Sequence, residues 1–209
     1  MEQLKTGTTT LGLVCKDGLV LAADRRATAG YMIADKHAQK VHIINDNLAL
    51  TIAGTVSDVQ LLIKYLRAEL KLKDIRTGRL TSIKEAANLL ASMVYGNIRK
   101  MSMIPGISHF VIGGFDSEGY HLYDLYPDGA LSEVDDYVSS GSGSVFVYGV
   151  LESQYKKGLL VHEGVELAKR AVEAALQRDA ASGNGIDVIT ITSKGIAKAF
   201  EQELTTRFQ

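Results

Sequence analysis

The sequence has few of the residues that mark particular classes of protein. It has one cysteine, two prolines and no tryptophan in 209 residues. A single cysteine, Cys15, excludes an internal disulfide and a four-cysteine zinc site. No apolar run reaches the roughly 18–20 residues that a membrane-spanning helix needs, and the first residues, MEQLKTG, lack the apolar core of a secretory signal. We therefore expect a cytoplasmic protein that has no membrane partner.

The sequence also lacks an excess of charge of either sign. It has 23 basic and 24 acidic residues, for a net charge of −1. Proteins that bind nucleic acids usually carry a basic excess or a basic stripe, so we expect no nucleic-acid partner. Hydrophobic residues make up 46% and charged residues 22%, which is typical of a globular protein. The length then predicts one compact domain with a substantial core.

The spacing of apolar residues predicts alternating blocks of strands and helices. Alternating and β-branched positions predict strands at 8–15, 19–24, 41–44, 48–53, 109–114, 120–126, 186–192 and 196–200. Apolar residues at three- and four-residue steps predict helices within 56–70, 83–98 and 161–181. Locally joined strands favour antiparallel sheets over parallel βαβ units. Because each helix has one apolar face, we expect an α+β fold of two antiparallel sheets flanked by helices.

The segment Gly7-Thr8-Thr9-Thr10 has two interpretations. It is either the polar face of a strand or the site where a short leader is removed by a cut between Gly7 and Thr8. A threonine at a chain terminus carries both a nucleophilic hydroxyl and an α-amine, whose pKa of about 7.7–8.0 suits a base near neutral pH. Gly7 suits the position before a cut, because glycine adopts backbone conformations that other residues avoid.

Asp24 and Lys40 also have two interpretations. Asp24 ends a buried-looking strand, and Lys40 begins the next one sixteen residues later. They are either an ordinary exposed pair or an activating pair beneath the Thr8 hydroxyl. In the second case the Lys40 charge would keep the neighbouring amine deprotonated and favour the alkoxide that develops during attack. Asp24 would then hold the buried lysine charged and oriented.

Three further segments carry candidate polar groups. Gly54 joins a predicted strand to a helix, and is either part of a plain turn or the donor of a backbone N–H to an oxyanion. Ser142 lies in the segment 141–144, which is either a loop only or a means of placing a hydroxyl near the amine. Asp179 and Ser182, taken alone, indicate a helix terminus with Gly183 beyond it.

No metal or cofactor site is expected. The histidines do not have the spacing of metal ligands; they are His37, His42, His109, His121 and His162. Both glycine-rich segments lack the lysine of a phosphate-binding loop. Cys15 is interpreted as a small buried hydrophobic residue.

Together, these motifs resemble those of catalytic β subunits of the 20S proteasome, most closely the archaeal ones. The resemblance extends from Thr8 to about Phe200. It rests on TTTLG at 8–12, DRRAT at 24–28, Lys40, AGTVSD at 53–58, GSGS at 141–144, YGVLE at 148–152 and RDAASG at 178–183.

The resemblance implies an N-terminal-nucleophile hydrolase with a four-layer αββα sandwich. Residues 1–7 would be a propeptide removed by autocleavage, and residues 8–209 a single catalytic domain. Thr8 would be the nucleophile, with Asp24 and Lys40 as its activating pair and Gly54 as the oxyanion donor. Ser142, Asp179 and Ser182 would surround the amine of Thr8.

The resemblance also implies where substrate binds. Thr28 and Gly54 would bind the backbone of an extended peptide, which would add as a strand. The specificity pocket would be lined by Ala27, Ala38, His42, Ile52, Ala53 and Val56. Since none of these residues is acidic, we expect cleavage after apolar residues with low selectivity.

The family implies rings of seven β subunits, capped by α-subunit rings and fed with unfolded polypeptides by an ATP-driven unfoldase. Three alternatives remain. A related bacterial threonine protease forms six-membered rings with a AAA unfoldase, but its chains are shorter. A non-catalytic ring subunit would require the loss of Thr8, Asp24 or Lys40, and all three are present. A small-molecule amidase of the same fold is disfavoured by the match across the specificity strands.

Overall fold

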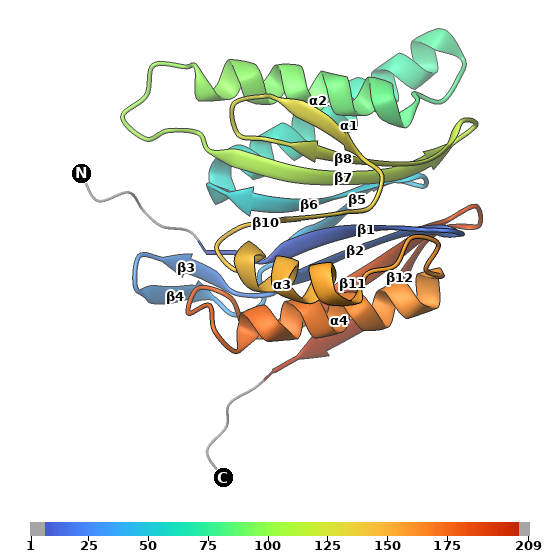
Figure 1. Cartoon of the computed structure of the whole chain (residues 1–209). Coiled ribbons are helices and arrows are strands. Elements are labelled where there is room, and N and C mark those ends of the chain that lie inside the picture. Colours follow the sequence, from blue (N-terminus) through green and yellow to red (C-terminus); the bar gives the residue numbers. More distant parts are fainter. Residues whose placement is uncertain (1–6, 205–209) are drawn as a thin grey trace.

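Two five-stranded sheets are stacked face to face and covered on both outer sides by helices (Figure 1). The computed structural model describes residues 7–204. The expected propeptide therefore lies outside the described residues except for Gly7, as do the last five residues of the expected catalytic domain.

The lower sheet in Figure 1 places the first strand of the chain and the strand that follows the last helix on either side of one central strand. All its pairings are antiparallel. In spatial order its strands are β10 (Tyr137–Ser140), β1 (Thr10–Cys15), β2 (Gly18–Asp24), β11 (Gly185–Thr192) and β12 (Gly195–Glu203). Thr10 pairs with Ala23, and Ile186 pairs with Asp24. The central strand β2 therefore ends at Asp24 between the first residues of β1 and β11.

The upper sheet places the end of β6 near the same end of the sandwich. In spatial order its strands are β5 (Val41–Asn45), β6 (Leu48–Gly54), β7 (Ser108–Asp116), β8 (Gly119–Leu125) and β9 (Leu131–Val134). A separate hairpin, β3 (Ala27–Ala29) and β4 (Met32–Asp35), follows β2 and projects from that end of the molecule (Figure 1).

The helices begin and end at recognisable local signals. They are α1 (Val56–Thr77), α2 (Ile83–Ile98), α3 (Ser144–Gln154) and α4 (Val161–Leu176). Ser82 and Glu85 form a capping box at the start of α2. Gly78, with φ of 66°, ends α1 in the left-handed conformation that glycine adopts without strain. Among the described residues, no helix is both long and apolar enough to cross a membrane.

Three hydrophobic cores separate the four layers. One lies between α1, α2 and the upper sheet and includes Leu66, Leu90 and Phe110. A second lies between the two sheets and includes Leu21. The third lies between the lower sheet and the helices α3 and α4, and includes Leu167. The expected αββα sandwich is thus confirmed.

Several local predictions differ from the structure. The helix expected over 161–181 ends at Leu176, where the chain turns and the Asp179 carboxylate accepts the N–H of Ala181. The helix α3 and the strands β3, β4, β9 and β10 were not predicted. The two strands of the β3–β4 hairpin are short, and β4 is exposed along its whole length, so it has no buried face that alternation could reveal.

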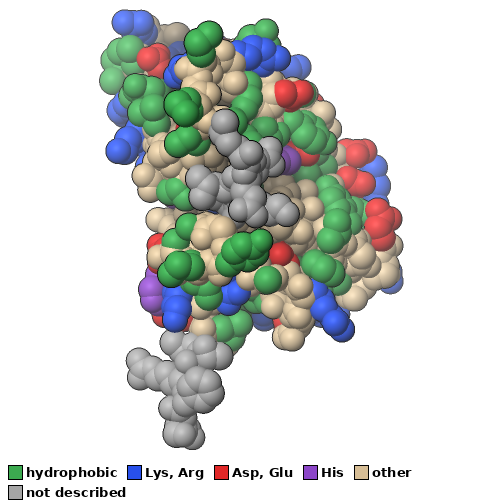
Figure 2. Space-filling model, turned by 90° about the vertical axis from the view of Figure 1, so that its left-hand side faces the viewer, with side chains coloured by type: hydrophobic (Ala, Val, Ile, Leu, Met, Phe, Trp, Pro, Cys, Tyr) green, Lys and Arg blue, Asp and Glu red, His purple; other side chains and the backbone are tan. Residues whose placement is uncertain are grey.

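The face of the molecule from which the β3–β4 hairpin projects is rich in exposed apolar side chains (Figure 2). Tyr31 and Met32 are exposed on the β3–β4 hairpin, and Met101 and Met103 are exposed on the segment between α2 and β7. Figure 1 shows that both segments project on the side where the described chain begins. The candidate active site lies at this end.

Candidate active site

Thr8 lies just before β1 and is almost entirely buried. Its hydroxyl donates a hydrogen bond to the carbonyl oxygen of Gly7 at 2.6 Å. Its backbone N–H donates to the Ser142 hydroxyl at 3.3 Å. The hydroxyl therefore lies beside the peptide bond that joins Gly7 to Thr8.

Gly7 is fixed from several directions. Its N–H donates to the Thr28 hydroxyl at 2.9 Å, and its carbonyl also accepts from Lys40 Nζ at 3.4 Å. A Cβ atom at this position would lie far inside contact distance of Ala181. The sequence argument for glycine here was backbone freedom, but Gly7 is not among the glycines with positive φ. The structural reason is the lack of space.

Asp24 and Lys40 form a buried ion pair, with Nζ and Oδ1 2.6 Å apart. The Asp24 side chain is fully buried, and 5% of the Lys40 side chain is exposed. The carboxylate also accepts the backbone N–H groups of Thr9, Arg26 and Gly183 at 2.9–3.0 Å. The interpretation as an exposed surface pair is therefore excluded.

Burial controls the proton affinity of Lys40. It lowers the pKa of the ammonium below the ordinary lysine value, and the negative charge of Asp24 opposes this effect. From the sequence we expected Asp24 to hold Lys40 charged. The structure provides that carboxylate, but the surrounding protein makes the ammonium release its proton more readily than an exposed lysine would.

Ser142, Asp179 and Ser182 form one hydrogen-bonded group next to the nitrogen of Thr8. Both serine hydroxyls donate to Oδ2 of Asp179 at 2.6 Å. Ser142 comes from the loop before α3, whereas Asp179 and Ser182 follow α4. The geometry therefore favours the interpretation in which this loop places the Ser142 hydroxyl near the nitrogen of Thr8.

Gly54 ends β6 and lines the same cavity as Thr8. Its φ is 121°, and a Cβ atom there would lie far inside contact distance of the Ile107 carbonyl. The sequence argument for Gly54 concerned its backbone N–H as a donor to an oxyanion. The structure adds that the neighbouring backbone also leaves no room for a side chain.

A cavity of about 400 Å³ opens beside Thr8 and Lys40. All the pocket residues expected from the sequence line it, namely Ala27, Ala38, His42, Ile52, Ala53 and Val56, together with Thr28 and Gly54. Residues that the sequence argument missed also line it: Ala34, Asp35, Gln39, Val59 and Gln60.

Asp35 changes the expected charge of this cavity. The predicted lining had no acid, but the β4 strand, which the sequence did not reveal, contributes the exposed carboxylate of Asp35. His42 lines the same cavity, where burial lowers the pKa of its imidazole and the positive charge of Arg67 acts in the same direction. His42 is therefore neutral near pH 7, which leaves a mostly apolar cavity with one acidic group.

A second cavity of about 320 Å³ lies beside β11 and β12, and Gln39 lines both cavities. None of the predicted site residues lines it. Arg25 lines it and forms ion pairs with Asp187, Glu201 and Glu203 at 3.2–3.4 Å. Its charged groups thus largely neutralise one another.

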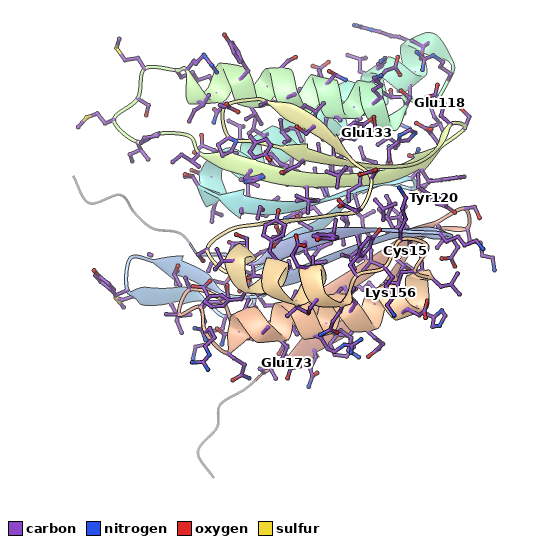
Figure 3. The ribbon with its side chains drawn as sticks, viewed as in Figure 1. Cys15, Glu118, Tyr120, Glu133, Lys156 and Glu173 are labelled. Carbon is purple, nitrogen blue, oxygen red and sulfur yellow. The ribbon has the colours of Figure 1, made fainter. Side chains whose placement is uncertain are left out.

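Neither Cys15 nor the histidines form a further reactive centre. Cys15 (labelled in Figure 3) is the last residue of β1 and is buried, as expected for a small hydrophobic residue. Within residues 7–204, no group of three or more His, Cys, Asp or Glu side chains is placed to hold a metal ion. The chemistry available at the Thr8 cavity is nucleophilic attack by a hydroxyl with a lysine and a carboxylate nearby.

Comparison with known proteins identifies the family. Residues 4–191 match the family model described as proteasome subunit. The chain is 41% identical over 206 residues to "Proteasome subunit beta" of Methanocaldococcus vulcanius, covering 98% of this chain and 90% of that protein. It is 46% identical over 189 residues to "Proteasome subunit beta 2" of Pyrococcus abyssi, covering 90% and 88%. The resemblance noted in the sequence is confirmed, and the chain belongs to the proteasome subunit family, among the β subunits of the archaeal type.

Proposed function

We propose that the chain is a catalytic β subunit of the 20S proteasome, a threonine endopeptidase whose nucleophile is Thr8. One observation carries the proposal. The Thr8 hydroxyl lies 2.6 Å from the Gly7 carbonyl oxygen, and the Lys40 ammonium lies 3.4 Å from the same oxygen. A hydroxyl and a buried cation thus meet at the peptide bond that self-cleavage has to break.

Self-cleavage would begin with attack of the Thr8 hydroxyl oxygen on the Gly7 carbonyl carbon. The bond from that carbon to the Thr8 nitrogen then breaks, and the nitrogen takes up the proton that the hydroxyl loses. Water hydrolyses the resulting ester and releases residues 1–7 with a carboxylate on Gly7. The bonds from Thr28 and Lys40 to Gly7 support this step, since they hold the reacting carbonyl in place.

Peptide hydrolysis would use the same groups after the cut. The new α-amine of Thr8, or Lys40 with its lowered pKa, accepts the proton when the hydroxyl attacks a substrate carbonyl. Departure of the amine product leaves an ester on Thr8, which water hydrolyses. Ser142 lies within hydrogen-bond distance of the Thr8 nitrogen and would orient the amine.

The substrate would be an extended segment of an unfolded polypeptide. Thr28 and Gly54 both line the cavity and would act as backbone partners of this segment, and Gly54 would donate its N–H to the oxyanion. The apolar lining supports cleavage after apolar residues with low selectivity, and Asp35 adds a weak preference for basic ones.

We also propose cytoplasmic rings of seven β subunits, capped by α-subunit rings and served by an ATP-driven unfoldase. The names of the relatives support this assembly.

The variant Thr8→Ala tests the proposal, with Thr8→Ser as its control. In assembled particles we expect Thr8→Ala to abolish both peptide hydrolysis and leader removal while rings still form. Thr8→Ser retains a hydroxyl and should keep measurable activity. Peptide hydrolysis by Thr8→Ala would overturn the assignment. Wild-type particles that assemble but cleave no peptide would instead favour a non-catalytic ring subunit.

A further inference from the structure

Thr9 touches both halves of the candidate active site. It is fully buried, and its backbone N–H donates to Oδ1 of Asp24 at 2.9 Å while its carbonyl accepts the N–H of Asp24 at 3.0 Å. Its hydroxyl oxygen lies 2.7 Å from that of Ser182. The main chain of Thr9 thus contacts the carboxylate of Asp24, which binds Lys40. Its side chain contacts Ser182, which belongs to the hydrogen-bonded group next to the nitrogen of Thr8.

We propose that Thr9 is a positioning residue whose hydroxyl acts through Ser182 and Asp179 on the terminal amine. This inference rests on the function proposed above, because it assigns a role within the same reaction. Thr9 itself does not touch the reacting bond in this account.

The direction of each hydrogen bond follows from the available protons. An ionised carboxylate only accepts, so Ser182 donates its one hydroxyl proton to Asp179 at 2.6 Å. Ser182 therefore has only lone pairs to offer to Thr9. The proton between these two hydroxyls belongs to Thr9, which is the donor of the 2.7 Å bond.

The same argument orients the other side of the carboxylate. Ser142 donates its proton to the same Oδ2 atom of Asp179 at 2.6 Å, so its lone pairs face the nitrogen of Thr8 at 3.3 Å. Asp179 Oδ2 is shared by two hydroxyl donors, and the bonds from Thr9 to Ser182 and from Ser182 to Asp179 follow one another in a chain, so that each strengthens the other. Loss of the Thr9 proton would leave a buried acceptor on Ser182 unpaired and loosen the far end of the chain of bonds.

Packing prevents the Thr9 hydroxyl from turning away. Gly143 lies against it so closely that a Cβ atom there would be under 3.0 Å from the hydroxyl oxygen. The rotamer of Thr9 is therefore fixed by its neighbour as well as by its hydrogen bond, as a positioning role requires.

The test compares Thr9→Val, which removes only the hydroxyl, with Thr9→Ser and Thr10→Val. Thr10 is the matched control, because it is also fully buried and its hydroxyl is 2.8 Å from that of Ser140. Each variant is produced with Thr8 already exposed by removal of a fused upstream domain, and is assembled into particles. The readouts are kcat and KM for a fluorogenic peptide.

We expect Thr9→Val to lower kcat about five- to tenfold, as the loss of one hydrogen bond worth about 1 kcal/mol implies, with KM changed less than about twofold. Thr9→Ser should recover at least half of the wild-type kcat, and Thr10→Val should stay within about twofold of wild type. An equal loss of kcat in Thr9→Val and Thr10→Val would overturn the proposal. So would a Thr9→Ser variant no better than Thr9→Val.

A double-mutant cycle tests the route of the effect. If Thr9 acts through Ser182, Thr9→Val costs nothing further in a Ser182→Ala background, whereas multiplying losses would overturn the proposal. Should Thr9→Val fail to assemble, Gly143→Ala displaces the same hydroxyl, and an unchanged kcat would again overturn it. These comparisons are made among active variants, so their failure leaves the Thr8→Ala test of the function intact.

Discussion

Gly7 packs against Ala181 so closely that no side chain fits between them. Ala181 lies between Asp179 and Ser182, so the residue before the proposed cut rests on the segment that orients the amine. A methyl group on Gly7 has to displace that segment, because its Cβ would meet both the side chain and the backbone of Ala181. The proposed self-cleavage would therefore depend on this contact.

We accordingly expect Gly7→Ala to slow leader removal at least about tenfold, since even small misplacement of reacting groups is costly. The intact mass of the purified chain over time measures the fraction that still carries residues 1–7. Gly149→Ala is the control, because a Cβ there meets open space. Adding Ala181→Gly to Gly7→Ala should restore part of the rate. Processing of Gly7→Ala at the wild-type rate would contradict the proposed geometry.

Replacement of Lys40 separates catalysis from stability. Lys40→Met removes the ammonium but keeps an extended apolar side chain, and we expect kcat to fall at least about 100-fold, the usual size of a proton-transfer contribution. It also leaves the Asp24 charge buried, which costs about 3–5 kcal/mol of unfolding free energy. The three backbone donors to Asp24 offset part of this cost.

The double variant Asp24→Asn/Lys40→Met provides the control for this prediction. It removes both charges, so the melting temperature should recover in part while peptide hydrolysis stays at the level of Lys40→Met. Recovery is only partial because the Asn side chain has one acceptor oxygen, whereas both oxygens of Asp24 accept backbone N–H groups. Near-normal turnover in either variant would show that Lys40 is not needed for proton transfer.

The sequence predicted the strands and helices whose apolar residues follow a regular pattern, and it pointed to the candidate site residues that belong to motifs. The strands around 19–24 and 48–53 were recognisable as continuous apolar runs, because they are buried along most or all of their length. The helix of 83–98 was recognisable because it buries one apolar face. The exposed strand β4 has no such face, so Asp35 was missed as a cavity residue.

The polar contacts of Thr9 were also beyond sequence reasoning. Thr9 and Ser182 are 173 positions apart, and their contact exists only because β1 and β11 flank β2 in one sheet. No local pattern distinguishes Thr9 from Thr10, although their hydroxyls have different partners. The motif around Thr8 therefore indicated the chemistry but not the supporting hydrogen bonds.

Asp35 is expected to affect substrate preference slightly. Its carboxylate is exposed at the cavity, where a charge interaction is worth about 0.2–1 kcal/mol. Asp35→Asn should therefore lower kcat/KM for peptides with a basic residue before the cut by about 1.4- to fivefold relative to apolar ones. Asp46→Asn removes the same charge in the distant β5–β6 turn and should leave the ratio unchanged. Equal ratios in all three proteins would show that Asp35 does not contact substrate.

Cys15 makes the stability of the chain sensitive to alkaline pH. Burial raises the pKa of its thiol from 9.0 to about 12, and the negative charges of Asp17 and Glu163 add to the effect. Between these two values the unfolded chain loses the thiol proton while the folded chain keeps it, so the unfolding free energy falls as pH rises. The urea midpoint of the wild type should decline from pH 8 to pH 10.5 more steeply than that of Cys15→Ala, which has no thiol.

Iodoacetamide should modify Cys15 at pH 8.5 only after urea is added, because the folded thiol stays protonated and buried. Parallel pH dependence of the two midpoints, or rapid modification of the folded chain, would contradict the raised pKa.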